Sequence, residues 1–386
     1  MMDSVLLQLN NEQFELKPDN KLDGRKTRQG KGFTINSNFC ESYKKDLKKQ
    51  GIYCPDINKA TKIVGSERKE VLEIQTSLPK QIYGTNAFEV SSFDAEKFYK
   101  KLLFRLDDLG VSTSENELRH TPLRRVDFSK IIILPAYLGE VNRAIYALSG
   151  FDYKPRSDAN FNKFNDGNGG TSIKFWNTTQ GLVIYDVIGN LLSNGFTKSE
   201  NVITDSFRAG KFKRNLVRIE LSLERKDSFE SVIRHNFKNT EKKRDFYLED
   251  VMSEELARGV LLKAFDTIFN DVAVGLLSLS EMEDNRLRAY LDNLKISIKK
   301  QEKLYYWVRM ATNFGISGTW EQIKLRYSGG SVANCKKEVA LILQELGRID
   351  GNIPNLIEFL RGELVRFEII KPRGELSTCK PLLNDI

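Results

Sequence analysis

The stretch TSIKFWNTTQGLVIYDVIG, residues 171–189, predicts two short strands that follow one another closely. Residues 171–177 and residues 181–189 are rich in β-branched and aromatic side chains, and the TTQ segment between them is typical of a hairpin connection. A polar, glycine-rich segment, NKFNDGNGG at residues 162–170, is expected to lead into them as a loop. This part of the chain is therefore expected to form antiparallel sheet.

Three more segments alternate apolar and polar residues, which is the pattern of a half-buried strand. They are VLEIQTS (71–77), RRVDFSKIIIL (124–134) and LVRIELSLE (216–224). Each carries an acid on the face opposite its aliphatic residues: Glu73, Asp127 and Glu220. Helices are expected at residues 93–109, where Gly110 is a stop signal, and at residues 140–148.

After about residue 245 the apolar pattern changes to the 3.6-residue period of helices. Helices are expected at residues 253–270, 284–313, 319–326 and 331–346. The predicted fold class is α+β, with an antiparallel-sheet core followed by a helical C-terminal domain. The expected division is residues 1–70 as an N-terminal segment of unassigned role, 71–244 as the α+β core, and 245–386 as a helical domain for DNA binding or oligomerisation.

Composition excludes several classes of protein. Of the 386 residues, 40% are hydrophobic and 29% charged, which excludes a mainly disordered chain. No apolar stretch reaches the roughly 20 residues of a spanning helix, and the N-terminus does not resemble a signal peptide, so a cytoplasmic protein is expected. Four scattered cysteines and two histidines argue against a structural zinc site, a Cys–His hydrolase and a nuclease with paired metal-binding histidines.

The charge balance indicates a polyanionic partner. The net charge is +8, and the basic residues cluster in five runs, at 24–32, 44–49, 211–214, 241–244 and 295–303. Any one run is more simply a solvated surface, but five runs together favour nucleic-acid binding. The segment 319–346 also has the form helix, glycine turn, helix. Either it is an ordinary helical hairpin or its second helix, with Lys336 and Lys337, lies in a DNA groove.

The three strand acids have two interpretations. If their strands are neighbours, Glu73, Asp127 and Glu220 converge on one surface, and several carboxylates together suit Mg²⁺ or Mn²⁺. Alternatively they lie on solvent-facing strand surfaces and form ion pairs with Arg125 and Arg218. The residues alone do not decide between these two possibilities.

Tyr185 is similarly ambiguous. A mid-strand tyrosine is usually structural, but a tyrosine can also be a nucleophile when a metal or cation withdraws charge from the reacting phosphate. Lys174, on the predicted partner strand, could then help to stabilise the pentavalent phosphorus. Phe175 or Trp176 could stack a base of a single strand.

Several of these segments, taken in order, resemble the gene II/X family of phage and plasmid replication proteins, the rolling-circle initiators of filamentous phages and related plasmids. The matching segments are residues 72–94 (LEIQTSLPKQIYGTNAFEVSSFD), 124–129 (RRVDFS), 172–189 (SIKFWNTTQGLVIYDVIG) and 215–229 (NLVRIELSLERKDSF), with a looser similarity through 303–317. The resemblance runs from about residue 71 to the end of the chain, and residues 1–70 match only weakly.

The resemblance implies an origin-specific, strand-specific DNA endonuclease that nicks one strand, attaches through a tyrosine to the new 5′-phosphate, and later rejoins the displaced strand. It implies Tyr185 as the nucleophile, Lys174 and Arg218 as catalytic helpers, and Glu73, Asp127 and Glu220 as ligands of Mg²⁺ or Mn²⁺. No phosphate-binding GxxxxGK[ST] loop is present, which agrees with rejoining without ATP. The sequence departs from the family after the tyrosine, where Asp186 replaces a frequent nearby lysine.

The resemblance also implies partners: supercoiled double-stranded origin DNA, the displaced single-stranded DNA, and a host helicase and polymerase. A homo-oligomer on DNA is possible, no membrane contact is expected, and the location would be the cytoplasm of a bacterial host. Two alternatives stay open. One is a non-enzymatic origin-binding or regulatory protein, and the other is an RNA-binding protein that uses an exposed sheet.

Overall fold

The structure is a computed structural model of the whole chain. The residues it describes are 2–20, 26–28, 33–38, 41–64, 67–148, 161–167, 170–176, 180–210, 215–223, 226–236, 245–280, 282–326, 329–346 and 352–371. None of the helices in these ranges is both long enough and apolar enough to cross a membrane.

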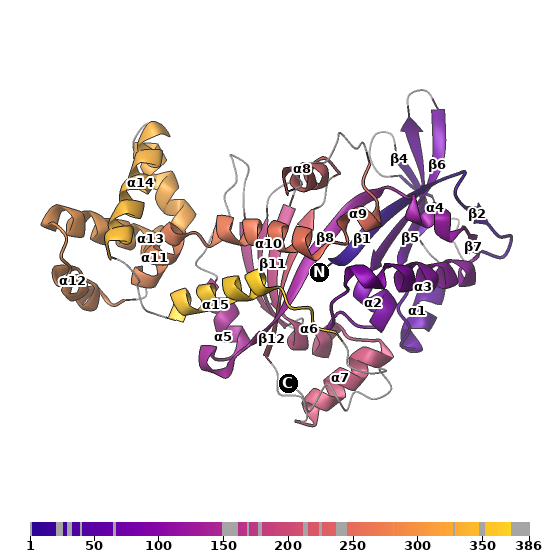
Figure 1. Cartoon of the computed structure of the whole chain (residues 1–386), viewed down its shortest axis with the longest axis horizontal. Helices are drawn as coiled ribbons and strands as arrows, with labels where there is room; N and C mark the ends of the chain where they lie inside the picture. The colour runs from indigo at the N-terminus through magenta and orange to yellow at the C-terminus, as the bar shows by residue number, and fades with distance from the viewer. Residues whose placement is uncertain are drawn as a thin grey trace.

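A ten-stranded sheet in which every neighbouring pair is antiparallel forms the centre of the molecule (Figure 1). Its strand order is β3-β4-β5-β6-β1-β8-β12-β11-β10-β9. The strands are β1 (Met2–Asn10), β3 (Lys26–Arg28), β4 (Phe33–Asn38), β5 (Asp56–Val64), β6 (Glu67–Ser77), β8 (Leu123–Leu134), β9 (Phe161–Gly167), β10 (Gly170–Trp176), β11 (Gln180–Asp186) and β12 (Asn215–Leu223). A separate pair joins β2 (Glu15–Leu16) to β7 (Val111–Ser112).

The two halves of the sheet follow the same path. In each half the first strand in the sequence, β1 or β8, lies at the centre of the sheet. The next three strands of this sheet lie further out, and the last strand, β6 or β12, pairs with the first. The inner strands pair with each other around Val5 and Val126. No repeat is visible in the sequence, so this symmetry belongs to the topology alone.

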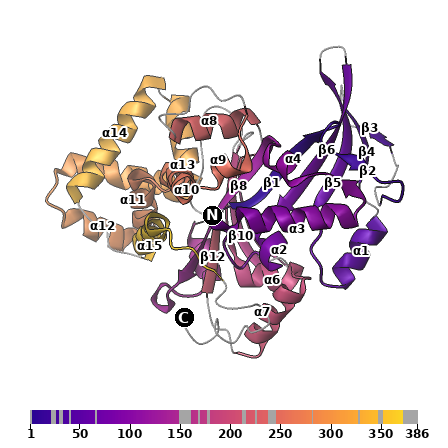
Figure 2. The same cartoon turned by 45° about the vertical axis from the view of Figure 1, so that its right-hand side comes forward.

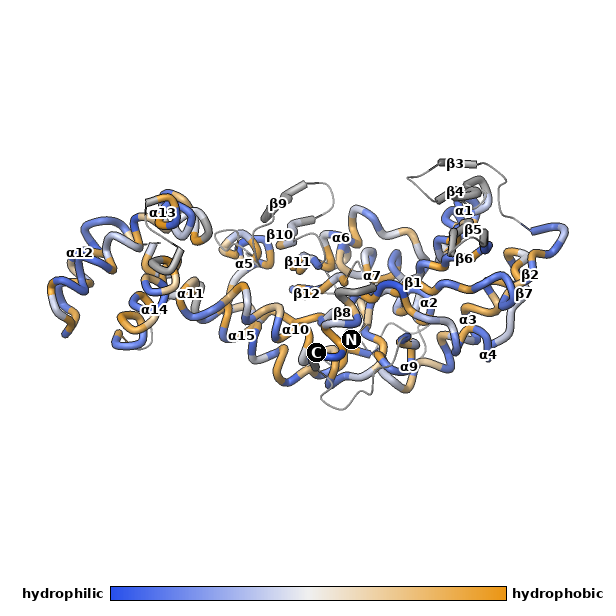
Figure 3. The backbone as a smooth tube through the Cα atoms, turned by 90° about the horizontal axis from the view of Figure 1, so that it is seen from above, coloured by the Kyte–Doolittle hydropathy of each residue, from blue (hydrophilic) through white to orange (hydrophobic). Residues whose placement is uncertain are grey.

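Fifteen α-helices accompany the described strands. They are α1 (Glu41–Lys49), α2 (Leu78–Tyr83), α3 (Ala95–Asp108), α4 (Glu115–Arg119), α5 (Val141–Ala147), α6 (Val187–Asn194), α7 (Lys198–Arg208), α8 (Lys226–Asn236), α9 (Leu248–Val251), α10 (Glu254–Ile268), α11 (Asp271–Ser280), α12 (Asp284–Asp292), α13 (Ile298–Arg326), α14 (Gly329–Leu346) and α15 (Asn352–Arg366). Helices α9, α10 and α15 lie along one side of the sheet (Figure 3).

That side of the sheet is apolar because the strands alternate as their sequences predict. Phe128, Phe175, Ile184 and Ile219 point to it and are fully buried. Phe269, just after α10, meets the ring of Phe175 edge-on at 5.7 Å between centroids. The hydrophobic core therefore lies between this face and the helices that cross it.

The predicted α+β fold class is confirmed, and some element boundaries differ from those expected. The segment expected as a loop at residues 162–170 is largely strand β9, which pairs with β10. Strand β11 ends at Asp186, because its side chain accepts from Ile188 N and caps helix α6, so residues 187–189 are helical. Residues 298–326 form one helical run with a kink at Gly315, whose φ is +67°.

The division at residues 70 and 244 remains a prediction, but the structure shows how those segments pack. Strand β1 lies between β6 and β8, so the first 70 residues share the sheet with the rest. Helices α11 to α14 form a lobe at one end of the molecule (Figures 1 and 2). After α15 the chain returns to the sheet, where Glu89 accepts from Ile370 N at 2.9 Å and from Lys130 Nζ at 2.8 Å.

Candidate functional site

The face of the sheet opposite the apolar core is polar and carries all the predicted site residues. Across β10, β11, β12 and β8, Ser172 lies opposite Tyr185, Tyr185 opposite Arg218, and Ser222 opposite Asp127. Since side chains of paired residues point to the same face, these strands present their polar side chains together. The two-residue period places each of these residues on the face opposite the aliphatic side chains, and the strand order joins those faces into one surface.

Arg218 is the centre of this face. Its side chain is only 1% exposed, and its guanidinium donates to Asn86 O at 2.5 Å, to Ser129 Oγ at 2.8 Å and to the carboxylate of Asp3. Its Nε lies 3.7 Å from Glu220 Oε2. Burial lowers the pKa of Arg218, but the surrounding carboxylates outweigh it and the pKa is raised, so the group stays charged.

Tyr185 lies beside this guanidinium. Its hydroxyl is 3.5 Å from Glu220 Oε2, and its ring packs at the edge of an apolar cluster that includes Val187 and Ile188 of α6. Burial raises the pKa of Tyr185 well above 10, and Glu220 and Asp3 add to this, while Arg218 opposes it. The phenol is therefore neutral at physiological pH in this arrangement.

Glu220 is a half-buried carboxyl surrounded by charges of both signs. Burial raises its pKa to about 8, and the carboxylates of Asp3 and Asp127 act in the same direction, against the attraction of Arg218. At pH 7 the group is therefore mostly protonated. When it loses that proton, it becomes a base next to the Tyr185 hydroxyl.

Asp127 is held firmly by its neighbours. Its side chain is 2% exposed and accepts from Arg125 Nε at 3.1 Å, from Arg125 Nη2 at 3.0 Å and from the hydroxyl of Ser4. Burial nevertheless raises its pKa. The ion pair with Arg125 is one of the pairs that the structural interpretation of the strand acids expects, and Arg218 with Glu220 is the other.

Glu73 lies apart from the other two acids. Register places Ser77 of β6 in line with Asp127, and Glu73 is four residues further along β6 and two strands away. At ordinary strand spacings this separates the Cα atoms of Glu73 and Asp127 by about 16 Å. Asp127 and Glu220, by contrast, are diagonal neighbours about 7–8 Å apart.

The predicted ligand set of Glu73, Asp127 and Glu220 therefore does not fit one divalent ion. Within the described ranges, no three His, Cys, Asp or Glu side chains are placed to hold a metal ion together. We derive no chemical step through Mg²⁺ or Mn²⁺.

Lys174 shares the polar face but points away from the tyrosine. It pairs with Val183, and its chain lies over Gly181, where an added Cβ would be 3.2 Å from Lys174 Cε. Its ammonium is 5.7 Å from the centre of the Trp176 ring. Trp176 is half-buried on this face, whereas Phe175 is buried in the core, so of the two rings proposed to stack a base only Trp176 lies on this face.

Asp3 is a member of the site that the sequence analysis missed. The alternation of Val5, Leu7 and Leu9 predicts a strand at the N-terminus, but it would place Asp3 on the apolar face. The pairing of β1 with β8 shifts register between Met2 and Ser4, and Asp3 reaches Arg218 on the polar face. A local pattern cannot show that shift.

The basic runs are less available to bind a polyanion than the sequence suggests, because several of their lysines form ion pairs. Lys44 and Lys49 pair with Asp56 and Asp46, and Lys300 and Lys303 pair with Glu345 and Glu338. The runs at 211–214 and 241–244 lie outside the described residues, as do most of residues 24–32.

The candidate helix-turn-helix corresponds to the end of α13 and to α14. The ammonium of Lys336 lies 5.2 Å from the Trp320 ring centre, and Lys337 is exposed. The connecting residues 327–328 lie outside the described part, so the DNA-reading role stays a prediction.

Comparisons with known proteins add little. No family model and no curated protein matches the chain. One solved structure, titled "Structure of Rolling Circle Replication Initiator Protein from Geobacillus stearothermophilus", is similar with a TM-score of 0.28 and 9% identity, over 69% of this chain and 84% of that chain.

Proposed function

We propose that this protein is a rolling-circle replication initiator that nicks and rejoins one strand of origin DNA through a covalent 5′-phosphotyrosine on Tyr185. The observation that carries the proposal is the placement of the Tyr185 hydroxyl, 3.5 Å from Glu220 and opposite Arg218 on a polar sheet face. The resemblance of the surrounding segments to the gene II/X family supports the same tyrosine.

In this proposal each residue has a defined task. The Tyr185 oxygen attacks the phosphorus, the bond from phosphorus to the 3′-oxygen breaks, and the departing oxygen takes up a proton from solvent. Deprotonated Glu220 accepts the phenol proton, and Arg218 offsets negative charge on the phosphate oxygens. The Lys174 ammonium would approach the phosphate only if the lysine side chain turned away from Gly181.

The proposed substrates are the supercoiled double-stranded origin and the displaced single strand, with a host helicase and polymerase acting afterwards. The test is incubation with a supercoiled plasmid carrying the origin of the protein's own replicon. We expect open-circular product whose 5′-end is blocked by protein, and no product with Tyr185→Phe. Origin binding without nicking would overturn the proposal.

The divalent ion is proposed as a requirement of the reaction, separately from any ligand set. The same assay is therefore run with Mg²⁺, with Mn²⁺ and with a chelator. Metal binding by Asp127 or Glu220 would require these side chains to leave Arg125 and Arg218. Nicking that persists in the presence of a chelator would show that the reaction needs no divalent ion.

A second function, non-enzymatic origin binding, is favoured by one observation. The raised pKa of Tyr185 makes the phenol a poor nucleophile in its present surroundings. In that case Tyr185→Phe would bind origin DNA as well as the wild type does, and neither protein would cut it.

A further inference from the structure

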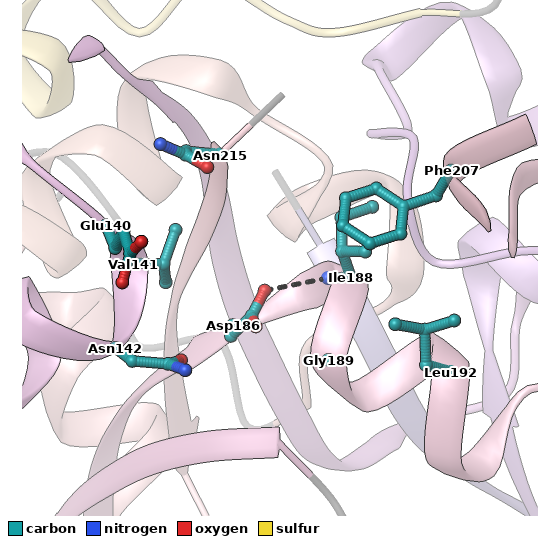
Figure 4. Close-up of a pocket in the computed structure, with 9 residues that line it drawn as sticks. All are labelled: Glu140, Val141, Asn142, Asp186, Ile188, Gly189, Leu192, Phe207 and Asn215. Carbon is teal, nitrogen blue, oxygen red and sulfur yellow. Dashed lines mark hydrogen bonds between the residues drawn. The ribbon is translucent and has the colours of Figure 1, made fainter. Parts of the chain in front are cut away.

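A small cavity lies at the end of the sheet, where β11 ends and β12 begins (Figure 4). Its volume is about 160 Å³, and residues from the start of α5, the start of α6 and the end of α7 line it. Asp186 lines it and directly follows Tyr185 at the end of β11, so their Cα atoms are about 3.8 Å apart, while their side chains leave the strand on opposite faces.

The two sides of the cavity differ in chemistry. Glu140, Asn142 and Asn215 lie on one side, and Ile188 and Phe207 lie on the other, with Asp186 between them (Figure 4). Phe207 is 37% exposed, so its ring is accessible from the opening. A flat group could therefore rest its face on the apolar side and present its edge to the polar side.

The polar side offers mainly hydrogen-bond acceptors. The Asp186 carboxylate accepts from Ile188 N at 3.0 Å and also from Gly189 N. A carboxylate has about four lone-pair sites, so it can still accept from a further donor. Glu140 begins α5 without a side-chain cap bond. The Asn215 amide donates to Gly139 O at a long 3.4 Å.

The size and the acceptors together select the ligand. A cavity of about 150 Å³ holds a benzene ring, so this one has room for a single six-membered ring. Two carboxylates repel a phosphate but accept from an exocyclic amine, which is how Asp and Glu recognise cytosine N4. Thymine has a carbonyl oxygen at that position and would place it against the carboxylates.

We propose that this cavity, at the end of the sheet that carries Tyr185, binds an unpaired cytosine of the single-stranded DNA on which the tyrosine acts. The proposal rests on the proposed function for its substrate, single-stranded DNA at the tyrosine. It adds a base-reading element, made by Asp186, Glu140 and the Phe207 ring, which would contribute to the choice of nick site.

The test measures binding of the full-length protein to fluorescent single strands by polarisation at fixed salt. The probes are an oligothymidine and the same oligomer with one central cytidine. We expect the wild type to bind the cytidine probe roughly fivefold or more tightly, as one good base contact provides. Phe207→Ala should bind both probes equally, and Val202→Ala, an exposed apolar change on the same helix, should keep the preference.

Asp186→Asn is the sharper variant. Asparagine caps a helix as well as aspartate does, so α6 should remain folded, and its amide can donate to a thymine carbonyl. We expect the preference to be lost or reversed toward thymidine. The proposal is overturned if the wild type has no preference or if Asp186→Asn keeps the wild-type preference.

A parallel nicking assay separates this inference from the proposed function. Nicking without any cytidine preference overturns the cavity site and leaves the tyrosine chemistry standing. Cytidine preference without nicking supports the cavity site and counts against the tyrosine chemistry.

Discussion

The two faces of the central sheet are built from the same strands and are stabilised in different ways. On the apolar face, Phe128 and Ile219 are buried among many equivalent neighbours. On the polar face, Arg218 and Asp127 are buried just as deeply, but each depends on a few named partners. One face gains stability from contact area, and the other must satisfy every charge it buries.

The comparison shows that the polar face holds charges that the fold does not need for its stability. An apolar residue at position 218 would be the simpler way to cover the sheet, because a buried ion pair is a weak source of net stability. Charges beside Tyr185 are what the proposed tyrosine chemistry requires. The predictions that follow test whether the two faces really differ in this manner.

The largest effect is expected on the apolar face. Phe128→Ala leaves a cavity in the core and should lower the free energy of unfolding by about 4 kcal/mol. The control is Phe104→Ala, whose ring is 71% exposed and which should change stability by less than about 0.5 kcal/mol. Urea denaturation measures both, and equal effects would contradict the assignment of the core face.

The next effect concerns the guanidinium at the centre of the polar face. Arg218→Ala leaves the carboxylate of Asp3 without its cation and Asn86 O and Ser129 Oγ without their donor, and should cost about 3 kcal/mol. The triple variant Arg218→Met, Asp3→Asn, Glu220→Gln should recover most of this loss, because no uncompensated charge remains. Arg288→Ala, which breaks an exposed pair with Asp284, should cost less than about 1 kcal/mol.

A smaller effect depends on pH. The pKa of Glu220 is raised to about 8 in the fold, above its ordinary value near 4.5, so the folded protein keeps a proton that the unfolded chain releases. Wild-type stability should therefore fall as pH rises from about 4.5 to 8. Glu220→Gln should match the wild type at pH 4 and become increasingly more stable than the wild type as the pH rises to 8, measured in thermal melts.

The Glu220 prediction also has a kinetic side. If Glu220 accepts the phenol proton, wild-type nicking should increase as pH rises through about 8, and Glu220→Gln should lose that dependence. Parallel stability curves for the two proteins between pH 4 and pH 8 would refute the raised pKa itself.

The smallest effect on stability is expected at the tyrosine. Tyr185→Phe removes a hydroxyl whose distance of 3.5 Å to Glu220 is at the limit of a hydrogen bond, so the loss should be below about 1 kcal/mol. Nicking, in contrast, should disappear. Tyr43→Phe, which removes a hydroxyl bonded to Asp108 at 2.6 Å, is the matched control and should leave nicking intact.

Much of the site could be predicted because strand alternation is local. The period of two already assigns Asp127, Glu220 and Arg218 to the face opposite the aliphatic residues, and the structure agrees. Glu73 obeys the same rule and is on the same face, but face alone does not determine distance. Its strand is separated from β8 by β1, which a pattern within residues 71–77 cannot reveal.

By itself the sequence determined that residues 71–77, 124–134 and 216–223 are strands and which side of each is apolar, since those properties depend on residues within a turn or two of one another. Only the tertiary structure decided that β1 enters the middle of the sheet, that Asp3 meets Arg218 across 215 residues of chain, and that the acids expected as a triad do not converge. Strand order and register depend on contacts between distant segments. Those contacts form because the whole sheet must bury one face, and no short stretch of sequence carries that information.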